Sequence, residues 1–264
     1  MRLATTSRLR ALKLGLALLL TLALPMAAAA GVFEEHVTGG VLDLGWLNGF
    51  GVSSNLKPLT ISSGHPAYPN PSGDGTVGLA QTSSTPDSGG ISLTCINPGV
   101  LSDYSWEAWV FTGDGNSRRG LVVRADAATL ADADPANDFS TCYQFVVQSG
   151  LLQINFRRLV NSAPSTLATW FSNTFPGGSP QINTWHHMKV MAVGNTFRCY
   201  WDGYELTTAP IVDATIPTGW VGVYNFRFDL GNIPFYVDDL ILDNLGVTPT
   251  ARASWGEVKS RYAK

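Results

Sequence analysis

The chain has 264 residues, of which 45% are hydrophobic and 14% charged, and it carries 27 glycines and 15 prolines. Apolar residues are plentiful enough for a packed core, so the glycines and prolines indicate turns between short strands rather than disorder. The formal net charge is −3, and from residue 31 onward it is −7, because all 20 acidic but only 13 of the 17 basic residues lie there. The sequence has no basic stripe for phosphate groups, which excludes nucleic acid as a partner.

Residues 1–30 have the pattern of a cleaved secretory signal peptide. Four basic residues precede an apolar run over 14–24, and four consecutive alanines then supply an A-x-A cleavage site. A retained membrane anchor is the alternative, but the apolar run is shorter than the about 20 residues that a span requires. We therefore expect a secreted protein, extracellular or at the cell surface, without a membrane span after cleavage.

Residues 31–245 are long enough for one large core and too short for two. Residues 32–50 predict a first strand and a turn. The stretch 51–90 is rich in Ser, Pro, Gly and Asn, and its prolines exclude central strands. We expect loops there, with short strands such as 78–81.

Further strands are predicted over 90–96, 104–111, 120–124, 143–148 and 151–160, and 120–124 is expected to pair with 143–148. Apolar and polar residues alternate in these stretches with the period of two that a half-buried strand requires. Residues 162–180 read as a loop. Its aromatic side chains either form a platform for sugar rings or close the edge of the domain.

The segment 126–138 is the most acidic in the protein. Its oxygen-bearing side chains are of the type that Ca²⁺ prefers, which makes a structural calcium site one interpretation. A solvated loop is the other, because the spacing of an EF-hand and its final glutamate are missing. The candidate ligands are Asp132, Asp134, Asn137 and Asp138.

Residues 185–206, WHHMKVMAVGNTFRCYWDGYEL, read as two alternating strands joined by a turn at Gly194 and Asn195. The pattern resembles the central hairpin of the concanavalin A-like lectin/glucanase and laminin-G-like superfamily. Three other stretches, SWEAWV at 105–110, GLVVR at 120–124 with YQFVV at 143–147, and FYVDDLIL at 235–242, follow in the order expected of that superfamily.

This resemblance implies an all-β fold, a two-sheet antiparallel jelly-roll sandwich over residues 31–245 in which the first strand pairs near the last. It also implies a role in binding glycans or proteins. In some members an acidic residue of the closing strand joins a structural calcium site, which would give that role to Asp238 or Asp239 here.

Catalysis by this fold is not supported by the motifs. The glucanases of the superfamily carry E-x-D-x-x-E or E-x-D-x-E on one strand, and none of the five glutamates here begins such a motif. Glu107 lies on a predicted strand, but position 109 is Trp. Carboxylates that are distant in sequence, or a Tyr, His and Arg set, could still converge in space, so a hydrolase or lyase remains the rival interpretation.

We therefore predict a non-catalytic carbohydrate-binding or adhesion module with a polysaccharide or glycan as partner. The expected ligand-binding residues are Trp109, Trp170, Arg198 and Tyr200, because aromatic rings stack on sugars and Arg donates a planar fork of hydrogen bonds to hydroxyls or a uronic carboxylate. A structural protein that contacts other cell-surface proteins is a third possibility.

Cys95, Cys142 and Cys199 lie in the exported part, where disulfides persist. Their odd number suggests one pair and one buried thiol, and we favour Cys95 with Cys142 because Cys199 lies on the apolar face of its strand. The absence of C-x-x-C spacing argues against zinc or a catalytic thiol.

Residues 246–264 differ in composition from the rest of the chain and predict a linker with a short amphipathic tail. This tail resembles the C-terminal tails of some exported bacterial proteins, which implies a sorting or surface-retention signal. A docked terminal helix is the alternative.

Overall fold

The computed structural model describes residues 31–35, 37, 46–48, 56–81, 90–95, 100–112, 117–126, 141–148, 153–227 and 234–245. The predicted signal peptide, the acidic ligands Asp132, Asp134 and Asp138, and the C-terminal tail lie outside these residues. Among the residues described, none forms a helix long and apolar enough to cross a membrane.

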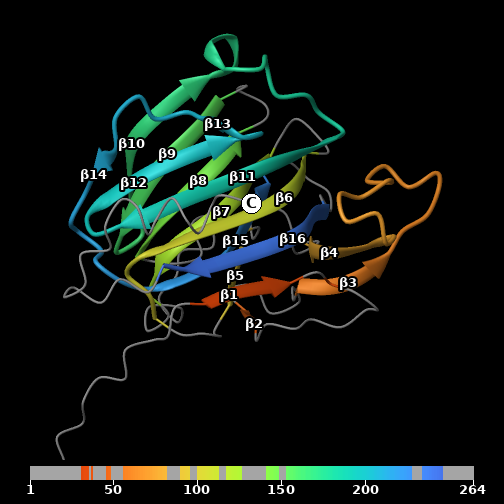
Figure 1. Cartoon of the computed structure of the whole chain (residues 1–264), viewed down its shortest axis with the longest axis horizontal. Helices are drawn as coiled ribbons and strands as arrows, with labels where there is room; N and C mark the ends of the chain where they lie inside the picture. Colours follow the sequence, from red (N-terminus) through yellow and green to blue (C-terminus); the bar gives the residue numbers. More distant parts are fainter. Residues whose placement is uncertain are drawn as a thin grey trace, which may run out of the picture.

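The described strands form two antiparallel sheets stacked in two layers (Figure 1). This is the two-sheet jelly-roll sandwich that the sequence predicted. Sheet A has the order β13 (Tyr204–Glu205), β12 (Thr196–Trp201), β11 (Thr184–Val193), β6 (Tyr104–Thr112), β16 (Pro234–Asn244), β4 (Thr76–Gln81) and β3 (Leu56–Thr60), and β1 (Gly31–Glu35) also pairs with β16 and β14 (Ile211–Val212) with β12.

Sheet B forms the second layer. Its middle strands are joined as consecutive hairpins, and the predicted pairing of 120–124 with 143–148 is confirmed. Its order is β10 (Ala163–Phe171), β9 (Gln153–Val160), β8 (Cys142–Gln148), β7 (Ser117–Ala125), β15 (Trp220–Arg227), β5 (Gly90–Cys95) and β2 (Trp46–Asn48).

The main core lies between the sheets and follows the alternation predicted from the sequence. In β6, Trp106, Ala108 and Val110 are fully buried, whereas the residues between them face outward. The indole Nε1 of Trp106 donates a 2.8 Å hydrogen bond to the carbonyl oxygen of Gly222 in β15. A core side chain of one sheet is thereby bonded to the backbone of the other.

The central hairpin of β11 and β12 has the predicted faces. Phe197, Cys199 and Trp201 of β12 are buried in the core. The chain then turns at Asp202 and Gly203, whose φ angles of 48° and 81° are the two left-handed positions that a type I′ turn requires. This turn returns the chain as β13 along the same edge.

β16, the last of the described strands, lies in the middle of sheet A. One edge of β16 pairs with β6, and the other pairs with β4 through residues 234–237 and with β1 through residues 240–244. The partner changes at the irregularity beside Asp238 and Asp239, and Asp239 has a φ of 45°. The expectation that the first strand pairs near the last is confirmed.

The prediction of a loop over residues 162–180 is wrong for its first half. Residues Ala163–Phe171 form β10, an edge strand joined to β9 by a turn at Asn161 and Ser162, which have φ angles of 50° and 63°. The strand lacks apolar alternation because most of its side chains are exposed at the edge. Pro164 is tolerated since an edge strand pairs on one side only. A short 3-10 helix, η4 (Ser172–Thr174), follows β10.

The strand order also contradicts a bond between Cys95 and Cys142. These residues lie on β5 and β8, and β15 and β7 stand between them in sheet B. Three steps of about 4.8 Å separate the two backbones by roughly 14 Å, and a disulfide needs Cα atoms within about 7 Å. Cys199 is a fully buried thiol in the main core, as expected, and burial raises its pKa well above the usual value.

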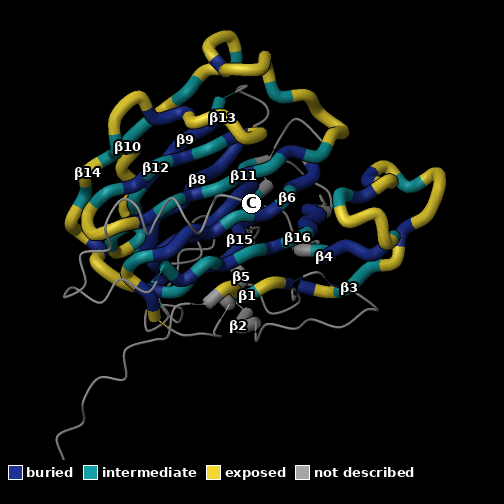
Figure 2. The backbone as a smooth tube through the Cα atoms, in the orientation of Figure 1, coloured by how far each residue is buried: buried dark blue, intermediate teal, exposed yellow. Residues whose placement is uncertain are grey.

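A loop over residues 61–75 covers one end of the outer face of sheet A. The indole of Trp185 donates a 2.8 Å hydrogen bond to the carbonyl of Ala67, and the ring of His65 meets that of Tyr236 edge-on at 5.0 Å. The loop has an exposed outer side (Figure 2). It leaves the rest of the outer face of sheet A for other contacts.

Candidate functional site

Polar and aromatic side chains form rows across the open part of the outer face of sheet A. Backbone pairing places Tyr200, Lys189, Glu107, Ile241 and Glu34 directly opposite one another on five successive strands. Four steps of about 4.8 Å make this row roughly 19 Å wide. The neighbouring row consists of Arg198, Met191, Ser105, Asp243 and Val32.

All residues of these two rows except Glu34 and Arg198 line a hollow of about 630 Å³. The volume lies within the range of about 300 to 1,000 Å³ that is common for ligand sites. Because the floor consists of paired strands, its side chains are held on a rigid support. The hollow is lined by Val32, Ser105, Glu107, His187, Lys189, Met191, Tyr200, Gly203, Ile241, Asp243 and Leu245.

Glu107 is the centre of the charged contacts in this hollow. Its carboxylate lies 2.9 Å from Nζ of Lys189 and 3.7 Å from Nε2 of His187. Burial, together with the nearby Lys189 charge, lowers the pKa of His187 despite the opposing effect of Glu107. His187 also lies against Trp109, with ring centroids 5.1 Å apart. The site therefore offers a carboxylate, an ammonium group and an imidazole that favours its neutral form.

Arg198 and Tyr200 are held by a common partner, Glu205 of β13. The guanidinium of Arg198 forms an ion pair with the Glu205 carboxylate, and Oγ1 of Thr207 donates to the same carboxylate at 2.7 Å. Burial would raise the pKa of Glu205, but the hydrogen bonds from Thr207, Arg198 and Tyr200 outweigh it and lower that pKa. Burial and the Glu205 charge raise the pKa of Tyr200, which therefore remains a neutral phenol.

The structure brings together three of the four predicted ligand-binding residues. Trp109, Arg198 and Tyr200 share the outer face of sheet A. Trp170 lies elsewhere, on the edge strand β10 of sheet B, where its ring meets that of the core residue Phe145 at 90° and 6.2 Å. Trp170 is separate from the other three because residues Ala163–Phe171 form a strand of sheet B and not the predicted loop.

Trp170 lines a second hollow of about 410 Å³, at the edge where β10 faces the segment after β13. Its apolar wall includes Trp170 and Phe175, and its polar wall includes Glu205 and Thr207. It combines an aromatic ring with hydroxyl and carboxylate groups, as the first hollow does. The remaining lining residues are Ala168, Thr174, Pro176, Leu206, Thr208, Ala209 and Ile211.

Asp238, one of the two residues of the closing strand expected to bind calcium, connects β16 to the loop over residues 61–75. It is fully buried, and its Oδ2 accepts hydrogen bonds from Nδ2 of Asn70 at 2.9 Å and from the backbone N–H of Ser72 at 3.0 Å. Burial, with the nearby Asp239 charge, raises its pKa. Its other oxygen, Oδ1, accepts the backbone N–H of Asp239 at 3.0 Å. The described residues hold no group of three or more His, Cys, Asp or Glu suited to a metal.

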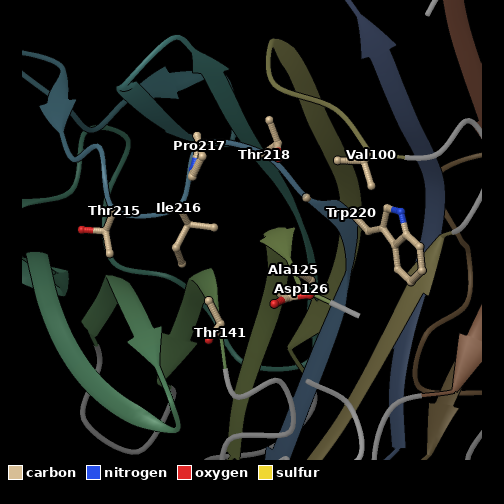
Figure 3. A pocket seen from close by; sticks show the side chains of 10 residues that line it. Val100, Ala125, Asp126, Thr141, Thr215, Ile216, Pro217, Thr218 and Trp220 are labelled. Atoms are coloured by element: carbon tan, nitrogen blue, oxygen red, sulfur yellow. The ribbon is translucent and has the colours of Figure 1, made fainter. Parts of the chain in front are cut away.

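A third hollow, of about 620 Å³, lies at one end of the sandwich, where β7 ends and β8 begins (Figure 3). Val100, Ile216, Pro217 and Trp220 contribute apolar side chains to its lining, and Asp126 and Thr141 contribute polar ones. Its walls are largely apolar and lack the rows of paired polar groups found on sheet A.

The sequence indicated that the charged residues of the site point outward, but it did not indicate that they meet. Alternation in β11 places His187 and Lys189 outward together, and alternation in β6 does the same for Glu107. That these groups meet depends on the register between β6 and β11, which no local pattern determines. Glu205 had no signal of its own, because its partners come from β12 and the following segment.

The two sheets and their strand order define a concanavalin A-like jelly-roll sandwich, the class that the sequence motifs indicated. The chain is similar to the cellulose induced protein Cip1, with a TM-score of 0.53 and 10% identity over 80% of this chain and 97% of that chain. It is also similar to the GH16 protein of the Bacteroides ovatus mixed linkage glucan PUL, solved in complex with a G4G4G3G product (TM-score 0.51, 9% identity, 80% and 98% coverage).

The β-glucanase of Bacillus licheniformis gives a TM-score of 0.50 at 10% identity, over 81% of this chain and 98% of that chain. No protein-family model and no curated protein matches the sequence. At these identities, the likeness establishes a common fold.

Proposed function

We propose that the protein is a secreted, non-catalytic carbohydrate-binding module that binds polysaccharide on the outer face of sheet A. The observation that carries this proposal is the row of Tyr200, Lys189 and Glu107 along the floor of the 630 Å³ hollow. A sugar presents C–H groups on its ring faces and hydroxyls around its edge. The hollow offers an aromatic ring, an ammonium donor and a carboxylate acceptor at adjacent positions.

The arrangement is fixed before a ligand arrives. Lys189 is held by Glu107, and Tyr200 is held by Glu205, so few rotamers remain to be ordered on binding. The carbohydrate class is also supported by the comparisons: one protein of this fold was solved with a G4G4G3G product, and another is a β-glucanase. Neither of these facts identifies the sugar that this chain binds.

The test is isothermal titration calorimetry of the mature protein against soluble polysaccharides, after a thermal-shift screen to select the ligands. Tyr200→Ala should weaken binding about tenfold, corresponding to ~1.4 kcal/mol, because a stacking surface is lost. Lys189→Met should weaken it as well, because hydrogen-bond donors are lost. Unchanged affinity in both variants would refute binding at this site.

Matched controls lie outside the hollow. Tyr68, in the loop over 61–75, is 46% exposed, and Lys57 on β3 is exposed. Tyr68→Ala and Lys57→Met remove the same chemical groups from surfaces away from the hollow. These variants should bind polysaccharide as the wild type does.

A glycoside hydrolase is the second candidate, and one observation favours it. Glu107 and Asp243 line the same hollow and are diagonal neighbours on β6 and β16, a relation that places Cα atoms about 7 to 8 Å apart. Hydrolysis of glycosides uses two carboxyl groups that face one site, and this pair supplies two. Glu107, however, already forms an ion pair with Lys189 at 2.9 Å. Release of oligosaccharides that is abolished by Glu107→Gln would establish the hydrolase instead.

A further inference from the structure

The two hollows adjoin at the short strand β13. Tyr200 and Gly203 line the first hollow, and Glu205 and Thr207 line the second. Tyr200 lies directly opposite Glu205 in the β12 and β13 ladder, so the two side chains are neighbours on the same face. The two binding surfaces are therefore connected through a single pair of contacting side chains.

The second hollow repeats the chemistry of the first. Trp170 and Phe175 offer aromatic surface, while Thr174, Thr207 and Glu205 offer hydroxyl and carboxylate groups. Trp170 is held in place by its contact with Phe145 in the core. A sugar unit could stack on a fixed ring there and donate hydroxyl hydrogens to nearby oxygens.

The charges along this surface select against an anionic ligand. Three carboxylates, those of Glu107, Glu205 and Asp243, line the hollows, and Lys189 is the one lysine or arginine among the described lining residues. Lys189 is already paired with Glu107, and the adjacent Arg198 is paired with Glu205. No described cation of this surface is left to neutralise a uronic carboxylate.

We propose that the two hollows form one continuous track, which crosses β13 and binds a single uncharged polysaccharide chain with Trp170 at its far end. This inference rests on the proposed function and extends it to a ligand class and a minimum length. A polysaccharide that reaches both hollows gains the second set of contacts without a second loss of translational freedom. Affinity should therefore rise with chain length until Trp170 is reached.

The experiment is calorimetry with a ladder of neutral β-linked gluco-oligosaccharides of increasing length. The Kd of the wild-type protein should fall at least about tenfold, by ~1.4 kcal/mol in binding free energy, between the short and the long oligosaccharides. This fall is called the step below. Trp170→Ala should abolish the step and leave the affinity for short members unchanged. Tyr200→Ala should weaken binding at every length.

Two further variants serve as controls. Trp170→Phe preserves ring packing on Phe145 and should retain part of the step, which separates loss of a binding ring from loss of folding. Phe171, the next residue, is 55% exposed, lies outside the second hollow and serves as the matched control. Phe171→Ala should retain the whole step.

The outcomes separate the two proposals. Length-dependent affinity that persists in Trp170→Ala, or equal affinity for oligouronates of the same length, would overturn the continuous neutral track while leaving the first hollow as a binding site. Binding that is insensitive to Tyr200→Ala, or no binding of any polysaccharide in the thermal-shift screen, would overturn the proposed function and this inference together.

Discussion

The side-chain amide of Asn70 donates a 2.9 Å hydrogen bond to the carboxylate of Asp238, which lies 168 positions further along the chain. The same carboxylate oxygen accepts the backbone N–H of Ser72. Asn70 also donates to the carbonyl of Thr76 and accepts the N–H of Gly75, so it connects the loop over 61–75 to β16. This loop is fixed to the sheet by buried polar contacts as well as by its apolar residues.

Asp238→Ala should destabilise the protein by roughly 2 kcal/mol, because the buried donors of Asn70 and Ser72 lose their acceptor. The free energy of unfolding in urea is the quantity to measure. Asp243, half-buried on the same strand, provides the control, and its replacement by Ala should change stability by less than about 0.5 kcal/mol. Equal losses for both variants would contradict the anchoring role of Asp238.

Trp106→Phe should lower the free energy of unfolding by roughly 2 to 3 kcal/mol. The change removes the donor to Gly222 and leaves a space in a fully buried position. Trp109→Phe, on the same strand but facing outward, should have less than half this effect. A comparison of the two variants by urea denaturation tests whether the bond between the sheets contributes to stability.

Stability should fall in acid through Asp213. Its carboxylate accepts hydrogen bonds from NH1 of Arg158 at 2.6 Å and from the phenol of Tyr143 at 2.8 Å. Burial would raise the pKa of Asp213, but hydrogen bonds from Thr215 and Tyr143 and the Arg158 charge outweigh it and lower that pKa. Because the folded-state pKa is depressed, the stabilisation is present above the unfolded value of about 3.9 and is lost as the pH falls through the folded value.

The measurement for Asp213 is urea denaturation between pH 7 and pH 3, on the wild type and on Asp213→Asn. The variant should be less stable at pH 7, and the difference should shrink towards pH 3. A constant difference across this range would show that ionisation of Asp213 makes no contribution. Burial and the hydrogen bond to Asp213 raise the pKa of Tyr143 to about 12, so Tyr143 remains a neutral donor throughout.

Gly177→Ala should weaken polysaccharide binding at the second hollow more than Gly178→Ala does. Both glycines have positive φ angles, 86° and 101°, so both substitutions strain the backbone. A Cβ on Gly177 would lie only 2.7 Å from the ring of Tyr204, whereas one on Gly178 would meet no described atom within 4 Å. Displacement of Tyr204 should disturb Pro176 and the wall of the hollow. Calorimetry with long oligosaccharides distinguishes this effect from strain alone.

Most of the fold could be predicted because its strands carry strict alternation. The buried faces of β6, β11 and β12 were each visible in local sequence, and the Asp202 and Gly203 pair indicated the turn before β13. β10 was missed because an exposed edge strand has no apolar face to alternate. Its turn residues, Asn161 and Ser162, are also a weaker signal than an Asn-Gly pair.

The site could be predicted only in part, for a related reason. Tyr200 and Arg198 lie on one short strand, so their common face follows from the period of two. The meeting of Glu107 with Lys189 requires the register of strands about 80 residues apart, which local sequence does not contain. The involvement of Glu205 likewise depends on the pairing of β13 with β12.

The central position of β16 affects the order in which the two sheets can form during synthesis. Until residues 234–244 have left the ribosome, β6 lacks a partner on one edge, and β4 and β1 lack the strand that joins them to the rest of sheet A. Sheet B differs, because β7, β8, β9 and β10 are successive hairpins that need only local contacts. A nascent chain can thus complete part of one layer early, but it exposes unpaired strand edges of the other until residues 234–244 are available, and these edges favour aggregation during that interval.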